Sequence, residues 1–457
     1  MAKLIEQLRD FPAVEELLQS KELSRDVDKL PRPYAALLVK EAVAELKEEF
    51  KKSKKPLEEK AVYSRIKKKI GTIKRKEINK VINATGIVVH TNLGRAPLSD
   101  ELFDNVKACV TGYGNIEFDV TDGKRGKRGE VAEEYLALLS GAEQGTVVNN
   151  CAAALFLILN SFANRKKVII SRSELVQIGG GFRIPDILKK SGAKLCEIGS
   201  TNITTLKDYE ENIDDQTGLI LKVHQSNFAQ KGFVESVPIQ PLVKLGAKYN
   251  VPVVNDLGSG VFIPTKKILG YDEQTVQESV RQGADLTCFS GDKMLGGAQA
   301  GLIVGRTDLV SKIKKNPLFR AMRVDKIVFS MLEKLLGYYL DNSYQENIKL
   351  WKVLTRSEAE LYKVGKYILK ELGNPDGLSV EATGAYVGGG ALPDSTIPSV
   401  GLVLSPPHKA TALIKKFREM ETPIIGRIDN ERFIIDLKAV DENDYEYLLN
   451  AFKKVLK

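Results

Sequence analysis

Lys293 stands in the segment best placed for chemistry, CFSGDKMLGG at residues 288–297. Apolar stretches on both sides, at residues 284–290 and 300–305, predict two buried strands. A lysine between two core strands either extends its charged end into solvent or keeps its amine out of water, as Schiff-base lysines do. This segment alone leaves both interpretations open.

Polar residues also follow two other predicted strands. Asn149 and Asn150 come after the apolar run GTVV and precede Cys151 and a row of alanines, the pattern of a capped helix N-terminus. The backbone N–H groups and the dipole of such a helix start favour an anion. Asp256 follows the buried run VPVVN. In open α/β sheets, ligands bind beyond the carboxyl ends of the strands, where these residues would meet.

This ordered set matches the needs of pyridoxal 5′-phosphate. The phosphate needs a helix N-terminus, the pyridine nitrogen needs a carboxylate that keeps it protonated, and the aldehyde needs a lysine. The chain offers residues 149–151, then Asp256, then Lys293 with Ser290 three positions before it. Each feature is weak alone, because aspartates after strands often only cap turns. The set as a whole predicts a pyridoxal phosphate site.

The elements that position these residues follow from short apolar runs between residues 145 and 305. The runs are GTVVN, KVIIS, AKLCEIG, GLILKVH, VPVVND, ADLTCFS and AGLIVG. Segments long enough for helices separate them, which predicts a mostly parallel α/β sheet. A long helical stretch follows from about residue 330, and then a smaller α+β region with a final helix over residues 441–456. We therefore expect a large α/β domain at residues 81–335 and a small C-terminal α+β domain at residues 336–457.

The first 80 residues predict a small helical module. Apolar residues at spacings of four, three and four mark one face of a helix, namely Val39, Val43, Leu46 and Phe50. Pro31 and Pro33 separate this helix from an earlier one, expected at about residues 3–20.

Most of the net charge of +9 lies in this module. Residues 1–80 hold 21 lysines and arginines against 14 aspartates and glutamates, a net charge of +7, and the other 377 residues carry about +2. The basic residues cluster in KKSKK at 51–55 and in RIKKKIGTIKRK at 65–76. Such clusters either solvate a helix face or bind a polyanion. Few aromatic residues are interleaved, so contact with a phosphate backbone is the better match.

Several classes of protein are not expected. No run approaches the 18 apolar residues of a membrane span, and the charged N-terminal stretch is not a secretory signal. Four dispersed cysteines and three histidines predict neither a disulfide framework nor a metal site. A cytoplasmic protein is expected.

Six motifs resemble the bacterial selenocysteine synthases, the L-seryl-tRNA(Sec) selenium transferases. They are INATGIVVHTNLGRAPLS (82–99), NIEFDVTDGKRGKRG (115–129), SELVQIGGGFRIPDI (173–187), LKVHQSNF (221–228), NDLGSG (255–260) and SGDKMLGGAQAG (290–301). Residues 384–399 and 423–430 also resemble this family, so the resemblance covers nearly the whole chain. It implies a fold-type I pyridoxal-phosphate enzyme.

The resemblance also implies the reaction and the partners. Seryl-tRNA(Sec) becomes selenocysteinyl-tRNA(Sec), through a dehydroalanyl-tRNA intermediate held on the cofactor, with selenophosphate as the selenium donor for selenoprotein biosynthesis. The family implies a homodecamer, a pentamer of dimers, and an N-terminal module that binds the tRNA. The charge of residues 1–80 agrees with this last expectation.

Roles at the cofactor follow from the same resemblance. Lys293 holds the cofactor and acts as the general base at the seryl Cα, and Asp256 keeps the pyridine nitrogen protonated. His224 and Ser226 lie at the strand end that contacts the pyridoxal 3-hydroxyl in this fold. No aromatic residue in SELVQIGG offers a ring to stack on the pyridine, so the stacking residue stays unassigned.

Five arginines are candidates for binding anions. The resemblance assigns selenophosphate to Arg95 and to the pair Arg320 and Arg323, which are three positions apart and are expected on one helix face. For Arg125 and Arg128, contact with the acceptor end of the tRNA and simple exposure to solvent both stay open.

Two other kinds of protein remain as alternatives. One is a pyridoxal enzyme that acts on a free amino acid or amino sugar, for which a basic N-terminal module would not be expected. The other is an RNA-binding scaffold on an inactive enzyme fold, which the intact Lys293, Asp256 and Ser290 oppose.

Overall fold

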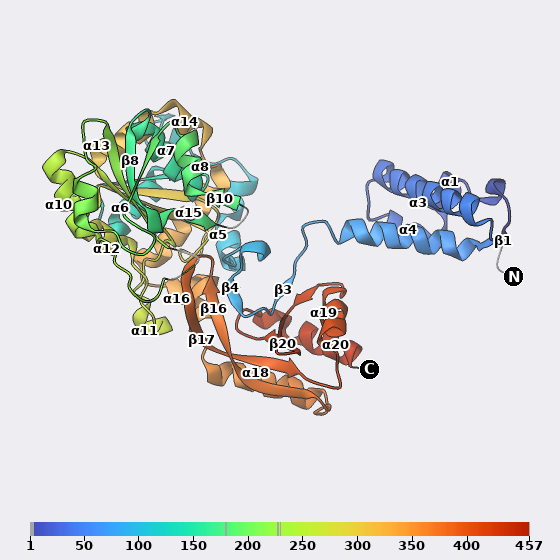
Figure 1. Cartoon of the computed structure of the whole chain (residues 1–457). Coiled ribbons are helices and arrows are strands. Elements are labelled where there is room, and N and C mark those ends of the chain that lie inside the picture. Colours follow the sequence, from blue (N-terminus) through green and yellow to red (C-terminus); the bar gives the residue numbers. More distant parts are fainter. Residues whose placement is uncertain (1–3, 179–180, 226–227, 229, 457) are drawn as a thin grey trace. The chain divides into compact units, whose positions relative to one another are not determined.

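The computed structural model describes residues 4–456 except 179–180, 226–227 and 229. The chain forms two compact units, residues 1–80 and 81–457, which are described separately (Figure 1). None of the helices in the described ranges has the length and apolar character needed to cross a bilayer.

The first unit is a helical module with its own core. It contains β1 (Leu4–Ile5) paired antiparallel with β2 (Leu57–Glu58), and the helices α1 (Val14–Gln19), α2 (Lys21–Val27), α3 (Arg32–Ser53) and α4 (Glu59–Lys74). The predicted apolar face of α3 is confirmed, because Val39, Val43, Leu46 and Phe50 are all buried against α4 and its neighbours. The helix expected at about residues 3–20 is present but shorter, covering only Val14–Gln19. Pro12 disfavours helical backbone at the residue before it, so helix α1 begins only at Val14.

The second unit is built on a seven-stranded sheet, as predicted from the seven apolar runs. Its spatial order is β11 (Lys194–Ile198), β8 (Lys167–Ser171), β12 (Thr217–Val223), β13 (Val253–Gly258), β14 (Leu286–Ser290), β15 (Gly301–Gly305) and β7 (Gln144–Val148). Neighbouring strands are parallel, except that β15 is antiparallel to both β14 and β7.

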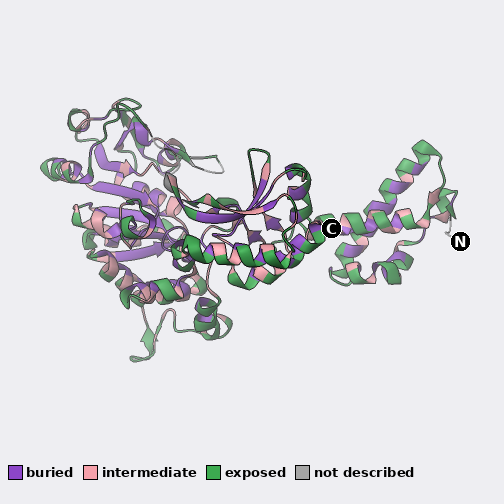
Figure 2. Ribbon diagram, turned by 90° about the horizontal axis from the view of Figure 1, so that it is seen from below, coloured by how far each residue is buried: buried purple, intermediate pink, exposed green. Residues whose placement is uncertain are grey.

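Helices cover both faces of this sheet, so its inner strands are buried on both sides (Figure 2). The edge strand β11 is mostly exposed. One face packs on α7 (Cys151–Ala163), α8 (Ile184–Lys190) and α13 (Thr307–Lys315). The other face packs on α5 (Asp100–Thr111), α6 (Glu130–Ser140), α12 (Val276–Arg281) and α15 (Lys326–Leu340), and nearer β11 on α9 (Leu206–Glu210) and α10 (Ile239–Tyr249). Within β8, Val168 and Ile170 face the first layer and Ile169 faces the second.

A smaller sheet completes the second unit. Its order is β19 (Arg427–Asp429), β20 (Arg432–Asp436), β17 (Ala391–Leu404), β16 (Leu378–Gly388) and β4 (Ile87–Val89). A third core joins it to α18 (Glu358–Glu371), α19 (Ala410–Arg418) and α20 (Tyr445–Val455). Residues 82–89 pair with C-terminal strands. β4 joins this sheet beside β16, and β3 (Ile82–Asn83) forms a separate two-stranded sheet with β18 (Ile424–Ile425). The domain boundary expected between residues 335 and 336 falls inside helix α15 (Lys326–Leu340). The division of the second unit into two domains stays a prediction.

Candidate active site

Lys293 lies in the turn between β14 and β15 and is buried, with 8% of its surface exposed. The Met294 N–H donates to the Ser259 carbonyl and holds this turn against the end of β13. The amine points toward Gly258, where a Cβ atom would lie 3.6 Å from Lys293 Nζ. The lysine therefore keeps its amine inside the site.

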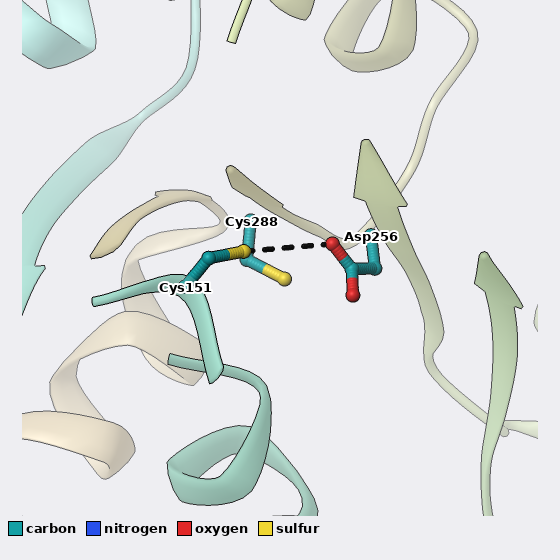
Figure 3. Close-up of side chains that lie close together, drawn as sticks. All are labelled: Cys151, Asp256 and Cys288. Carbon is teal, nitrogen blue, oxygen red and sulfur yellow. Dashed lines mark hydrogen bonds between the residues drawn. The ribbon is translucent and has the colours of Figure 1, made fainter. Parts of the chain in front are cut away.

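Asp256 meets two cysteines because of the sheet register. Asp256 on β13 and Cys288 on β14 are direct partners in adjacent parallel strands, so their side chains point to the same face. Cys151 is the first residue of α7, which covers that face. The Cys151 thiol donates to Asp256 Oδ1 at 3.6 Å, as Figure 3 shows. The two sulfurs and the carboxylate oxygen lie within 4.8 Å of one another.

The electrostatic balance at Asp256 is dominated by burial, which raises the pKa of this carboxyl above its ordinary value. The charge of Lys293, the thiols of Cys151 and Cys288 and the charge of His224 each lower its pKa, but by less. A buried carboxylate of this kind gains stability from a further cationic partner.

His224 follows β12 beside Asp256, and its backbone N–H donates to the Asp256 carbonyl at 2.9 Å. Its Nε2 atom lies 3.4 Å from Oε1 of Glu273, a carboxylate that is 4% exposed. Its Nδ1 atom is buried and has no hydrogen-bond partner in the described part of the chain. A ligand that enters the site could fill that position.

The start of α7 has the predicted cap. The Asn150 side chain accepts from the Ala153 N–H at 2.9 Å, which leaves N–H groups of the first turn for an anion. The Asn149 N–H donates to the Met322 carbonyl and so ties the segment that holds Arg323 to the end of β7. Ser290, at the end of β14, is buried with the turn that follows it.

Arg95 reaches the same turn from a distant part of the chain. Its Nη1 atom donates to both oxygens of Asp292, at 2.9 and 2.7 Å, directly beside Lys293. Arg95 itself has a φ of +62°, an uncommon backbone conformation that gives a tight turn after His90. Arg95 uses only its Nη1 atom to bind both Asp292 oxygens. Among the described residues, its Nε and Nη2 atoms have no hydrogen-bond partner and stay available for an anion.

The expectation that Arg320 and Arg323 share a helix face is wrong. Helix α14 (Pro317–Ala321) contains Arg320 in its last turn and ends before Arg323, because residue 322 has left the helical conformation. Arg320 is exposed. Arg323 lies near Glu117, and its charge contributes to lowering the pKa of that carboxyl.

Arg125 and Arg128 also contact Glu117. They belong to the hairpin of β5 (Phe118–Asp119) and β6 (Lys124–Arg125) and the loop after it. Arg128 donates to Glu117 at 2.9 Å and to the Val324 carbonyl at 2.8 Å, so it anchors the hairpin. Arg125 is largely exposed and pairs with Glu117 at 3.1 Å. Contact with tRNA stays a prediction for both.

The structure thus brings Lys293, Asp256, Cys151 and His224 together at one edge of the sheet. Ser226 lies outside the described residues.

A family model described as L-seryl-tRNA selenium transferase matches residues 81–441. The chain belongs to the L-seryl-tRNA selenium transferase family. The L-seryl-tRNA(Sec) selenium transferase of Aquifex aeolicus is 41% identical over 449 residues, which cover 96% of this chain and 99% of that protein. The enzyme of the same name from Carboxydothermus hydrogenoformans is 41% identical over 456 residues, 98% of each chain.

A solved structure agrees with the fold of this selenium transferase family member. D-Glucosaminate-6-phosphate ammonia-lyase superposes with a TM-score of 0.60 at 19% identity, over 84% of this chain and 97% of that chain. The predicted fold class and the predicted class of enzyme are confirmed.

Family membership also supports pyridoxal 5′-phosphate, as predicted, and the site fits this group. The buried Asp256 carboxylate suits a protonated ring nitrogen, the Lys293 amine suits the aldehyde, and the start of α7 suits the phosphate. The unpaired Nδ1 atom of His224 suits a ring hydroxyl.

The sequence interpretation missed three residues of the selenium transferase site. Asp292 stands within the SGDK motif, and its position beside Lys293 was a usable signal. Cys288 lies two residues before Ser290 in a strand and so faces the same side of the sheet. Glu273 comes from a loop with no motif, so nothing in its local sequence pointed to His224.

Proposed function

We propose that the chain converts L-seryl-tRNA(Sec) to L-selenocysteinyl-tRNA(Sec) with selenophosphate as the selenium donor. The observation that carries this proposal is the buried Lys293 amine beside Asp256 in a chain of this family. The net change replaces the seryl hydroxyl at Cβ by selenium and releases phosphate from the donor.

Each residue of the site has a distinct task in this proposal. Pyridoxal phosphate, when bound, supplies a ring that accepts the electron pair released at the seryl Cα. Lys293 holds the aldehyde carbon and, as a free amine, takes the Cα proton. Asp256 holds the proton on the ring nitrogen. The apolar walls around this edge of the sheet exclude water, which strengthens these interactions.

The arginines serve the selenium donor. The seryl carboxyl is esterified to tRNA and carries no charge, so the site needs no arginine for a substrate carboxylate. Selenophosphate is the remaining small anion, and planar guanidinium groups suit its oxygens. Arg95 lies next to Lys293 through Asp292, and Arg323 is tied to the start of α7 through its neighbour Met322.

Arg95→Gln is expected to raise the KM for selenophosphate about tenfold or more and to leave cofactor binding unchanged. A hydrogen bond to a charged group contributes about 1.5–3 kcal/mol. Initial rates at varied selenophosphate concentration check this result. Arg306→Gln is the matched control, since Arg306 pairs with Asp285 and Asp308 outside the site. An unchanged KM in Arg95→Gln would exclude Arg95 from the donor site.

Asp256→Asn is expected to lower kcat at least about 100-fold, because a neutral amide cannot hold the ring proton.

The same change, Asp256→Asn, should stabilise the cofactor-free protein at high pH. The folded-state pKa of Asp256 is raised, so its ionisation costs stability as pH rises from about 3.9 through the raised value. Thermal unfolding of both cofactor-free proteins at pH 5 and pH 8 should show a larger gain at pH 8.

An exposed aspartate provides the control for this stability effect. Asp429→Asn should show no gain that grows with pH, because Asp429 is exposed. If Asp256→Asn turned over at the wild-type rate, another residue would have to hold the ring proton.

Conversion of purified seryl-tRNA(Sec) tests the proposed function directly. Selenocysteinyl-tRNA(Sec) should form only when the enzyme, pyridoxal phosphate and selenophosphate are all present. Turnover of a free amino acid or amino sugar, with no reaction on seryl-tRNA(Sec), would favour the alternative of a small-molecule pyridoxal enzyme instead.

Residues 1–80 are proposed to bind the tRNA, since they carry a net charge of +7 and form a separate folded unit. Assembly as a homodecamer and a cytoplasmic location also stay predictions. Sedimentation velocity of the full chain would decide the assembly state.

A further inference from the structure

Two cysteines and one carboxylate converge behind the cofactor site. Asp256 and Cys288 are register partners on β13 and β14, and Cys151 begins the helix that covers their face of the sheet. Figure 3 shows both sulfurs directed toward the Asp256 carboxylate. The donor and acceptor atoms of all three lie within 4.8 Å of one another. No step of the proposed reaction uses either thiol.

We propose that Cys151 and Cys288 are positioning residues for Asp256. Their thiols donate hydrogen bonds to its carboxylate and hold it as an anion oriented toward the ring nitrogen. This inference rests on the proposed function, in which Asp256 keeps that nitrogen protonated.

The carboxylate needs these donors because of its surroundings. Asp256 is 9% exposed, and an ionised carboxylate that is buried without hydrogen-bond donors is strongly disfavoured. The charged and titratable groups that face it are Lys293, His224, Cys151 and Cys288. Lys293 would be linked to the cofactor aldehyde before substrate binds and would then contribute less charge, so the thiols would remain as fixed donors.

Cys288 is suited to stay a donor at neutral pH. It is fully buried, and the neighbouring Cys151 thiol, its burial and the nearby carboxylate all raise its pKa. A protonated thiol offers one weak S–H donor. The Cys288 sulfur lies within 4.8 Å of both the Cys151 sulfur and an Asp256 carboxylate oxygen, so the two thiols form one cluster around the carboxylate.

Simple packing is the alternative, because buried cysteines commonly act as small apolar residues. Both sulfurs do contact the core beside α7. The other two cysteines differ in that they face neutral acceptors, Cys109 beside Ser330 and Cys196 beside Asn212. A test must therefore separate the loss of a donor from the loss of sulfur volume.

The experiment uses the full-length protein with Cys→Ala and Cys→Ser changes at positions 151 and 288, and Cys196→Ala as control. Serine keeps a donor and alanine does not, while both remove the sulfur. The Kd for pyridoxal phosphate is measured by fluorescence from pH 5 to pH 9. The alanine variants should bind about tenfold more weakly, and the acid limb of their affinity profile should lie about one pH unit higher.

The serine variants and Cys196→Ala should match the wild type in both quantities. Wild-type profiles in the alanine variants would overturn the proposal, as would serine variants as impaired as the alanine variants, because packing would then explain both. A wild-type protein that binds no pyridoxal phosphate would instead contradict the proposed function.

A second measurement needs no cysteine variant. The infrared S–H stretching bands should lie at higher wavenumber in Asp256→Asn than in the wild type, because the amide is an uncharged and weaker hydrogen-bond acceptor. Unchanged S–H bands would overturn the proposal even if an alanine variant failed to fold.

Discussion

Lys293→Ala is expected to abolish turnover of seryl-tRNA(Sec), with a loss of at least about 1,000-fold, because one residue supplies both the covalent link to the cofactor and the base at Cα. The near-ultraviolet to blue absorbance of lysine-bound pyridoxal should disappear as well. Borohydride reduction followed by peptide mass spectrometry should mark Lys293 in the wild type and leave the variant unmarked.

A second lysine serves as the control for this result. Lys314 is partly buried by an ion pair with Glu133, away from the proposed site. Lys314→Ala should keep the absorbance, the reduced adduct at Lys293 and the turnover. A covalent adduct that persists at another residue of Lys293→Ala would contradict the assignment of Lys293.

Local patterns predicted the elements of the large sheet, because every strand except the edge strand β11 is buried on both faces and so reads as a short apolar run. They did not show that β15 runs antiparallel to both neighbours. They also did not show that β4 joins the C-terminal sheet, where Ile87 pairs with Tyr386 about 300 positions away. Pairing between distant segments depends on tertiary packing, which an apolar run alone does not encode.

The active site, too, could be predicted from the sequence only in part. Asp256, Asn150 and Lys293 could be predicted because residues after parallel strands meet at one edge of the sheet. The register that sets Asp256 beside Cys288 joins residues 32 positions apart and depends on how the two strands align. The ion pair of Arg95 with Asp292 joins residues 197 positions apart. Arg320 and Arg323 were misplaced because spacing alone does not tell where a short helix ends.

Helix α4 shows which basic residues are available to a polyanion. Arg65 and Lys69 lie on the side that packs on α3, where Arg65 pairs with Glu49 and Lys69 with Glu45. Lys67 and Lys68 are exposed, and no ion pair of theirs is found among the described residues. Arg65 and Lys69 therefore have a structural role, whereas Lys67 and Lys68 are available for phosphate contacts.

Deletion of residues 1–80 is expected to abolish conversion of seryl-tRNA(Sec) while the remaining chain keeps its cofactor linkage. The cores of the second unit contain only residues beyond 81, and the core of the first unit ends at Ile70, so neither unit loses its core. The absorbance of the bound cofactor tests whether the truncated chain keeps its cofactor linkage. Binding of tRNA at varied salt concentration tests whether the truncated chain has lost the tRNA site. Full tRNA conversion by the truncated protein would exclude the module as the binding site.

The charge on α4 refines this prediction in the full-length chain. Replacing Lys67 and Lys68 by glutamine should weaken tRNA binding and reduce the slope of log K against log salt by about 1 per lysine, since each phosphate contact releases counterions. Replacing Arg65 and Lys69 is the matched control, with the same loss of charge but on the face that pairs with α3. Equal losses in both variants would indicate a general field of positive charge, whereas a loss confined to Lys67 and Lys68 would place the phosphate backbone on the exposed face of α4.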